Sequence, residues 1–167
     1  PWAMFHTNGQ LRSRGNYQNG LRNGPFEVYF SNGQLRSRGT HSQDKRNGPY
    51  VSHYENGQMD SRGSFVNGNK EGVWEWFYAN GQLRQKSVHK DDVLDGTLES
   101  FFESGQLKAT EHYSAGKQDG PYVTYHENGQ GHGRGQFCNG LPDGDYELYQ
   151  KDGSLRESGT YKRGVRK

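Results

Sequence analysis

A glycine recurs every 24 residues along this chain, and no other feature restricts its fold as much. The seven glycines each follow Asn, Asp or Ser and lie at positions 9, 33, 57, 81, 105, 129 and 153. A fixed period of this size is typical of a repeat architecture. Asn-Gly and Asp-Gly are also the strongest short signals for a two-residue hairpin turn, because both central residues of that turn need φ > 0. The series therefore predicts consecutive β-hairpins with a tight turn at each of these glycines.

Each repeat contains two extended runs separated by a polar, glycine-rich loop. In the unit from Gly9 to Asn32, residues 11–17 form the first run, 18–24 the loop and 26–30 the second run. No segment has helical periodicity, and glycine recurs too often for a helix. We therefore predict an all-β fold, an elongated antiparallel β-meander of consecutive hairpins built from 24-residue repeats.

The repeat also sets the domain organisation that we expect, which is a single array over residues 1–167. Residues 1–8 form an N-terminal cap or a partial repeat, and residues 153–167 form a partial C-terminal repeat. The complete repeats start near Gly9, Gly33, Gly57, Gly81, Gly105 and Gly129.

Composition decides between an ordered array and a disordered chain. The mean hydropathy of −1.22 would suit disorder, but the net charge is only +2, and there are 11 Tyr, 8 Phe and 3 Trp. Aromatic residues at fixed repeat positions can build a thin, regular core. The single cysteine, Cys138, excludes an internal disulfide. Because the chain starts at Pro1, we expect a fragment or a processed product that has lost any targeting segment, so periplasm and cytoplasm stay open.

Alternation along the first run separates a packed face from a basic face. One parity carries leucines and, six residues later, aromatic or histidine side chains, with glycines between them. The opposite parity carries two basic columns. The first column is Arg12, Arg36, Arg84, Lys108 and Arg156, and the second is Arg14, Arg38, Arg62, Lys86 and Arg134. We expect both columns on one surface, and we name the second as a candidate partner-binding set.

The second run has aromatic residues on both of its faces. Trp74 and Trp76 share one parity, whereas Phe77 has the other. Core and surface therefore cannot both be free of large rings, and we expect at least one of the two tryptophans to be exposed. Aromatic side chains dominate the energetics of protein interfaces, so Trp74, Trp76 and Phe77 complete the candidate partner-binding set.

No pattern in the chain indicates catalysis, a metal or a cofactor. None of the seven His residues has a metal-binding spacing to another ligand on the same element, and His126 and His132 could only meet as a pair across a turn. No Gly-x-Ser-x-Gly elbow is present. Glu residues recur in the second run, and we expect them to pair across strands with the basic columns. Their positions are 27, 75, 99 and 147.

The repeat unit resembles the MORN repeat, and more closely the bacterial MORN repeat variant. The resemblance is carried best by Gly33-Gln-Leu35, Phe65-Val-Asn-Gly68, Lys70-Glu-Gly72 and Trp74-Glu-Trp-Phe-Tyr78, and it covers residues 8–164. The sequence departs from the pattern at Ser87, Asp91, Asp92 and Gly131.

The resemblance implies a binding function without enzymatic activity. Bacterial proteins built from this variant resemble antitoxins and immunity proteins, including those that neutralise secreted effectors such as phospholipases. We therefore expect a protein that occupies the surface of a toxin or effector. Two alternatives stay open at this point, a peripheral module that binds anionic lipid headgroups and a structural scaffold. Nucleic-acid binding is disfavoured, because the net charge is too low.

Overall fold

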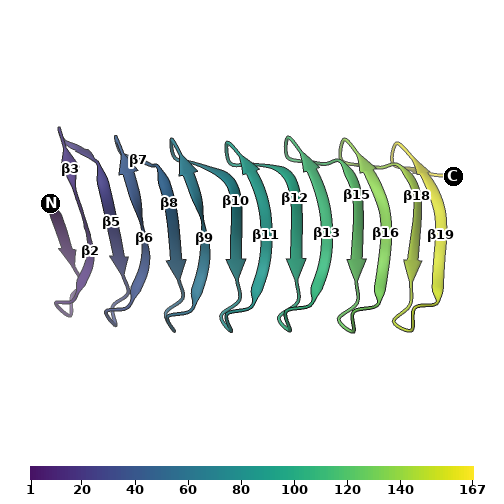
Figure 1. Ribbon diagram of the computed structural model, residues 1–167, viewed down its shortest axis with the longest axis horizontal. Helices are drawn as coiled ribbons and strands as arrows, with labels where there is room; N and C mark the ends of the chain where they lie inside the picture. The colour runs from purple at the N-terminus through teal and green to yellow at the C-terminus, as the bar shows by residue number, and fades with distance from the viewer. The chain divides into compact units, whose positions relative to one another are not determined.

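The computed structural model describes residues 1–167 and contains only strands and turns, which confirms the predicted all-β meander of hairpins (Figure 1). It contains no helix long and apolar enough to cross a membrane. The chain divides into two compact units, which are described separately. Unit 1 comprises residues 1–82 and 90–92, and unit 2 comprises residues 83–89 and 93–167.

In unit 1 the main strands pair antiparallel in chain order, and short strands extend the hairpins at their turns. The strands are β1 (Trp2–Phe5), β2 (Leu11–Gly15), β3 (Tyr17–Gln18), β4 (Leu21–Arg22), β5 (Gly24–Tyr29), β6 (Leu35–Ser42), β7 (Lys45–Arg46), β8 (Gly48–His53), β9 (Met59–Val66) and β10 (Asn69–Phe77).

Unit 2 repeats the same antiparallel arrangement. Its strands are β11 (Leu83–Lys90, with Lys90 assigned to unit 1), β12 (Val93–Phe101), β13 (Leu107–Ser114), β14 (Lys117–Gln118), β15 (Gly120–Tyr125), β16 (Gly131–Cys138), β17 (Leu141–Pro142), β18 (Gly144–Tyr149), β19 (Leu155–Lys162) and β20 (Val165–Arg166).

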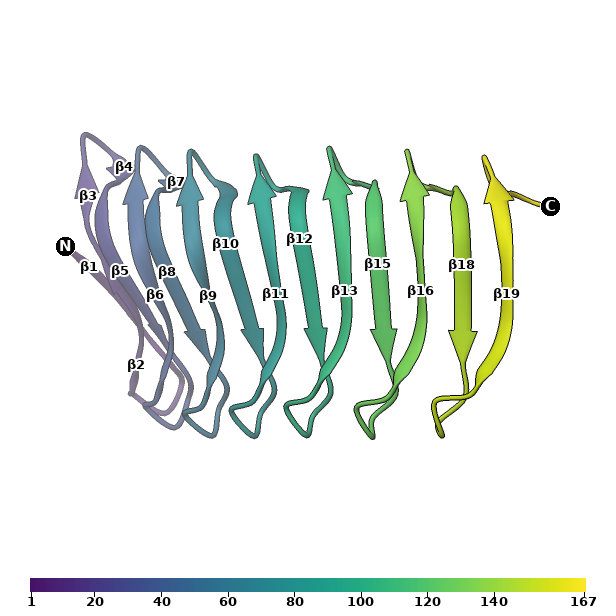
Figure 2. The same ribbon diagram turned by 45° about the vertical axis from the view of Figure 1, so that its right-hand side comes forward.

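The two-residue turns do not lie at the recurring Asn-Gly pairs where we expected them. At Asn32-Gly33 only the glycine has φ > 0, at 86°. Phe30 donates to the carbonyl of Gln34, so this turn has three residues and ends in a left-handed glycine. The two-residue turns with both φ values positive lie instead within the predicted polar loops, for example at Asn19-Gly20. In each unit the two kinds of turn occupy opposite ends of the strands (Figure 2).

Asparagine recurs in the three-residue turns because of its side chain. The Asn56 Oδ1 accepts a hydrogen bond from the Gln58 amide at 3.0 Å, while its Nδ2 donates to the Ala79 carbonyl of the following turn at 2.9 Å. Asn8 and Asn128 make the same pair of bonds. One side chain thus closes its own turn and joins it to the next repeat.

A β-bulge beside the three-residue turn moves one basic column to the other face, and it recurs in six hairpins. The register shifts by one residue between Val28 and Tyr29, so Leu35 lies opposite Tyr29. As a consequence the Arg36 guanidinium stacks on the Phe30 ring at 5.7 Å. The next repeat behaves alike, since Asp60 accepts a hydrogen bond from Ser52 at 2.8 Å. The expected single basic surface is therefore wrong, because a bulge reverses the alternation at that point.

The core consists of rings that lie on glycines. We call the side of each sheet that carries Phe26, Tyr50, Phe65 and Trp74 in unit 1, and Tyr122, Phe137, Tyr146 and Tyr161 in unit 2, the ring face. A Cβ added to Gly63 would lie 2.3 Å from the Trp74 ring, and one added to Gly159 would lie 2.9 Å from the Tyr146 ring. A residue without Cβ is required wherever a ring crosses a neighbouring strand so closely.

Candidate protein-interaction face

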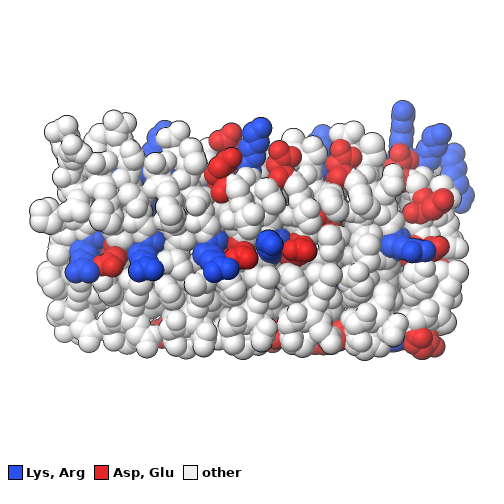
Figure 3. All heavy atoms as spheres, viewed as in Figure 1, with Lys and Arg blue, Asp and Glu red and all other residues white.

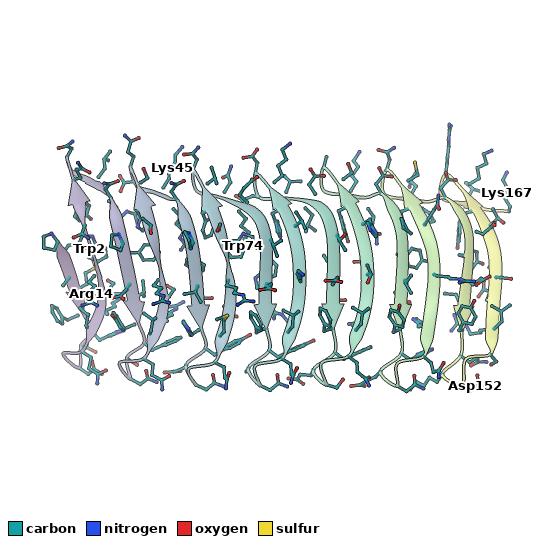
Figure 4. All side chains as sticks on the ribbon, in the orientation of Figure 1. Trp2, Arg14, Lys45, Trp74, Asp152 and Lys167 are labelled. Carbon is teal, nitrogen blue, oxygen red and sulfur yellow. The ribbon has the colours of Figure 1, made fainter.

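Arg and Glu side chains pair across strands on the face opposite the rings. We call this side the ion-pair face and define it by Arg14, Glu27, Arg38, Arg62 and Glu75 in unit 1, and by Arg134 and Glu147 in unit 2. The charged side chains appear as adjacent blue and red atoms in Figure 3, and Figure 4 labels Arg14 at the middle of β2.

Three of these arginines have a carboxylate partner 13 residues later. Arg14 Nε lies 2.5 Å from Glu27 Oε2, Arg134 lies 2.6 Å from Glu147, and Arg62 pairs in the same way with Glu75. The prediction that the glutamates pair with the basic column is thus confirmed for 27, 75 and 147. The arginines remain more than half exposed, at 58%, 55% and 62% of their side chains.

A tyrosine completes two of the pairs. The Tyr29 hydroxyl donates to Glu27 Oε2 at 2.7 Å, and the Tyr149 hydroxyl donates to Glu147. The hydrogen bond from Tyr29, followed by the one from Arg14, lowers the pKa of Glu27, and the same carboxylate raises the pKa of Tyr29. Both glutamates are therefore held as anions, and most of the basic column is locally neutralised.

The second repeat departs from this pattern. Arg38 faces Val51 on β8, whereas four equivalent positions, 27, 75, 99 and 147, hold a glutamate, and it forms no ion pair. His53 takes the place of Tyr29, and its Nδ1 is buried without a hydrogen-bond partner. Arg38 also lies across from Glu27, but that carboxylate is already bound by Arg14. Unit 1 thus has two arginines around one glutamate at β2, β5 and β6.

A groove of about 680 Å³ lies beside Arg38. Its rim carries Arg14, Glu27, Arg38, Pro25, Pro49 and Val51, and three rings of the opposite face also line it, those of Trp2, Phe26 and Tyr50. Trp2 and Tyr50 are half-buried and Phe26 is buried. Beside the groove, β6 and β8 share only the pairs Ser37–Ser52 and Arg38–Val51. Proline has no N–H to donate and so cannot close the ladder.

The other candidate residues are divided between the two faces. Phe77 lies on the ion-pair face, under the Arg62 guanidinium at 5.6 Å. Trp74 and Trp76 stack on the ring face with their centroids 5.8 Å apart. Trp74 is only 2% exposed and donates its indole N–H to the Ser64 carbonyl, so its side chain is not available to a partner. Trp76 is half-buried, so the expectation that one of the two tryptophans is exposed is wrong, because the two indoles stack on each other.

In unit 2 the candidate residues are Lys86 and Arg134. Arg134 is exposed and paired as described, and Lys86 is exposed on β11 next to buried Ser87. The Arg38 groove is the feature that sequence reasoning missed. The replacement of a recurring glutamate by Val51 was the signal that could have pointed to it.

The close contact between Ser87 and His89 is not suited to catalysis. Ser87 Oγ lies 3.0 Å from His89 Nε2, but Ser87 is fully buried, so no substrate can reach the hydroxyl. His126 and His132 do meet, with ring centroids 4.6 Å apart. Their nitrogens contact the Tyr149 carbonyl and the Thr124 hydroxyl, and no group of three potential metal ligands occurs.

Comparison with known proteins identifies the repeat. A family described as the MORN repeat variant matches seven consecutive segments, residues 1–19, 22–43, 46–67, 70–91, 94–115, 118–139 and 142–163. A search of curated proteins found no match.

Proposed function

Because this chain belongs to the MORN repeat variant family, whose arrays are repeat-based binding or scaffold modules and generally non-catalytic, we propose that it binds a protein partner through the ion-pair face. The partner that we propose is a toxin or secreted effector, such as a phospholipase, whose surface the module occupies and thereby blocks.

The observation that carries a protein partner is the pairing of the arginines. An anionic membrane attracts basic residues by their summed charge, about 1 kcal/mol for each one near the surface. Here Glu27, Glu75 and Glu147 neutralise three of the five cations of the column. The remaining pattern of paired charges, an unpaired Arg38 and half-buried aromatics resembles the uneven chemistry of a protein interface, where a few residues provide most of the binding energy.

The test is co-expression with the product of the neighbouring gene. We expect a stoichiometric complex by size-exclusion chromatography and calorimetry, with loss of the partner's toxicity or enzymatic activity. Absence of a complex, together with co-sedimentation with anionic liposomes that moderate salt abolishes, would replace this proposal by the lipid-binding alternative. A complex in which the partner keeps its activity would favour the scaffold alternative.

A further inference from the structure

Resting on the proposed protein-binding function, we propose that the Arg38 groove receives an acidic segment of the partner in which a carboxylate stands next to a large apolar side chain. The carboxylate pairs with Arg38, and the apolar side chain enters the groove against Pro49, Val51 and the half-buried rings of Trp2 and Tyr50.

The first argument compares equivalent positions in the repeat. Position 27 holds a carboxylate that accepts from Arg14 and from Tyr29. The equivalent position 24 residues later is Val51, while the donors are retained as Arg38 and His53. Neither donor has an acceptor, and the His53 Nδ1 is buried without a partner. This repeat therefore keeps the cation of the motif and lacks its anion.

The second argument concerns charge. At β2, β5 and β6 the ion-pair face has Arg14 and Arg38 against Glu27 alone, and Glu27 lies 2.5 Å from Arg14. A partner's carboxylate would meet Arg38 without displacing an existing ion pair. At Arg62 the same carboxylate would have to compete with Glu75, which is only 19% exposed. Arg38, and not Arg62, is thus the arginine expected to contribute most to binding.

The third argument concerns shape. A volume of about 680 Å³ lies within the range of roughly 300–1,000 Å³ found for ligand sites. The β2–β5 ladder does not include Pro25, and the β6–β8 ladder does not include Pro49, so side chains rather than paired backbone form the walls of the groove. A cation at the rim of an apolar groove selects for an occupant that joins both properties in adjacent residues.

The proposal is tested with three short peptides and the full chain. The probe is acetyl-Gly-Phe-Asp-Gly-amide, and its controls replace Asp by Asn or Phe by Gly. Binding is followed by shifts of backbone amide signals in ¹H–¹⁵N spectra. We expect saturable shifts at Arg38, Thr40 and Val51 with the first peptide and affinities about tenfold weaker with each control. Asn keeps an acceptor but lacks the negative charge that strengthens the bond to Arg38, and Gly lacks the apolar side chain that the groove would bury.

Two variants probe the groove, and two matched variants serve as controls. Arg38→Gln removes the cation, and Val51→Glu supplies the carboxylate that positions 27, 75, 99 and 147 have. Both should weaken binding of the Phe-Asp peptide by about tenfold or more. Arg62→Gln and Val123→Glu change equivalent positions away from the groove and should alter affinity less than about twofold. Retention of the remaining amide signals shows that each variant is folded.

Equal affinity for the Asp and Asn peptides, equal effects of Arg38→Gln and Arg62→Gln, or no shift of groove signals at millimolar peptide would overturn the inference. The proposed function is judged separately by the partner complex. If that complex forms and Arg38→Gln leaves its affinity unchanged, the groove inference fails while protein binding stands. If the peptide binds as expected but no partner complex forms, the toxin-neutralising function fails instead.

Discussion

The contact between Gly63 and Trp74 lets one methyl group test how the rings and glycines build the core. A Cβ at position 63 would lie 2.3 Å from Cδ2 of the indole, whereas carbon atoms pack best at about 3.5–4.0 Å. The indole would have to move by more than about 1 Å. It is 2% exposed, packs against Phe65 at 4.9 Å, and donates to Ser64 at 3.0 Å.

From these contacts we expect Gly63→Ala to lower the free energy of unfolding by about 3 kcal/mol, since overpacking costs about 1–3 kcal/mol and a strained or lost buried hydrogen bond adds about 1 kcal/mol. Equilibrium urea denaturation measures the change. Gly131→Ala is the control, because nothing lies within 4 Å of the added Cβ and the backbone is not left-handed there. It should change stability by less than about 0.5 kcal/mol.

A double-mutant cycle identifies the cause of the loss. Trp74→Leu removes the indole that the new methyl group would strike, so Gly63→Ala should cost much less in that background than in the native chain. A loss below about 1 kcal/mol for Gly63→Ala alone, or strict additivity of the two substitutions, would refute the ring-on-glycine account of the core.

Three further outcomes follow from the turns and the ion pairs. The pKa of Glu27 is lowered by Tyr29 and Arg14. The Glu27 carboxylate therefore stabilises the fold above the ordinary Glu pKa of about 4.3, and this contribution is lost as the pH falls through the lower pKa of the folded state. The urea midpoint should drop between about pH 5 and pH 3, and the drop should be smaller in Glu27→Gln. Asn56→Ala should cost about 1–2 kcal/mol in urea denaturation and Asn56→Asp less, because aspartate keeps the acceptor and loses only the donor to Ala79; unchanged stability in Asn56→Asp would contradict the joining role of Nδ2. Gln43 has a left-handed backbone with φ at 48°, which Asn tolerates better than Gln. Gln43→Asn should therefore raise the free energy of unfolding by about 0.5 kcal/mol in urea denaturation, whereas Gln34→Asn should leave it unchanged.

The 24-residue period and its turn residues were sufficient to predict the class of fold. Alternation of side chains along a strand depends only on local backbone geometry, so the glycine column on the packed parity and the pairing of the glutamates with the basic columns could be predicted from the sequence. The contacts of Gly63 with Trp74 and of Arg14 with Glu27 also depend on the cross-strand register, which the structure supplied. Because the motif is repeated, each of these contacts recurs, so a repeat that departs from the pattern does not change the predicted fold class.

Only the tertiary structure determined the turn types and the faces beyond the bulge. An Asn-Gly pair suits either a two-residue or a three-residue turn, and the bonds from Asn56 to the next repeat show why asparagine recurs where its own φ is negative. The bulge is not encoded by any single residue type, yet it moves Arg36 onto the ring face. The groove beside Arg38 is lined by residues of several successive strands, so it is a property of neighbouring repeats in contact and not of one repeat read by itself.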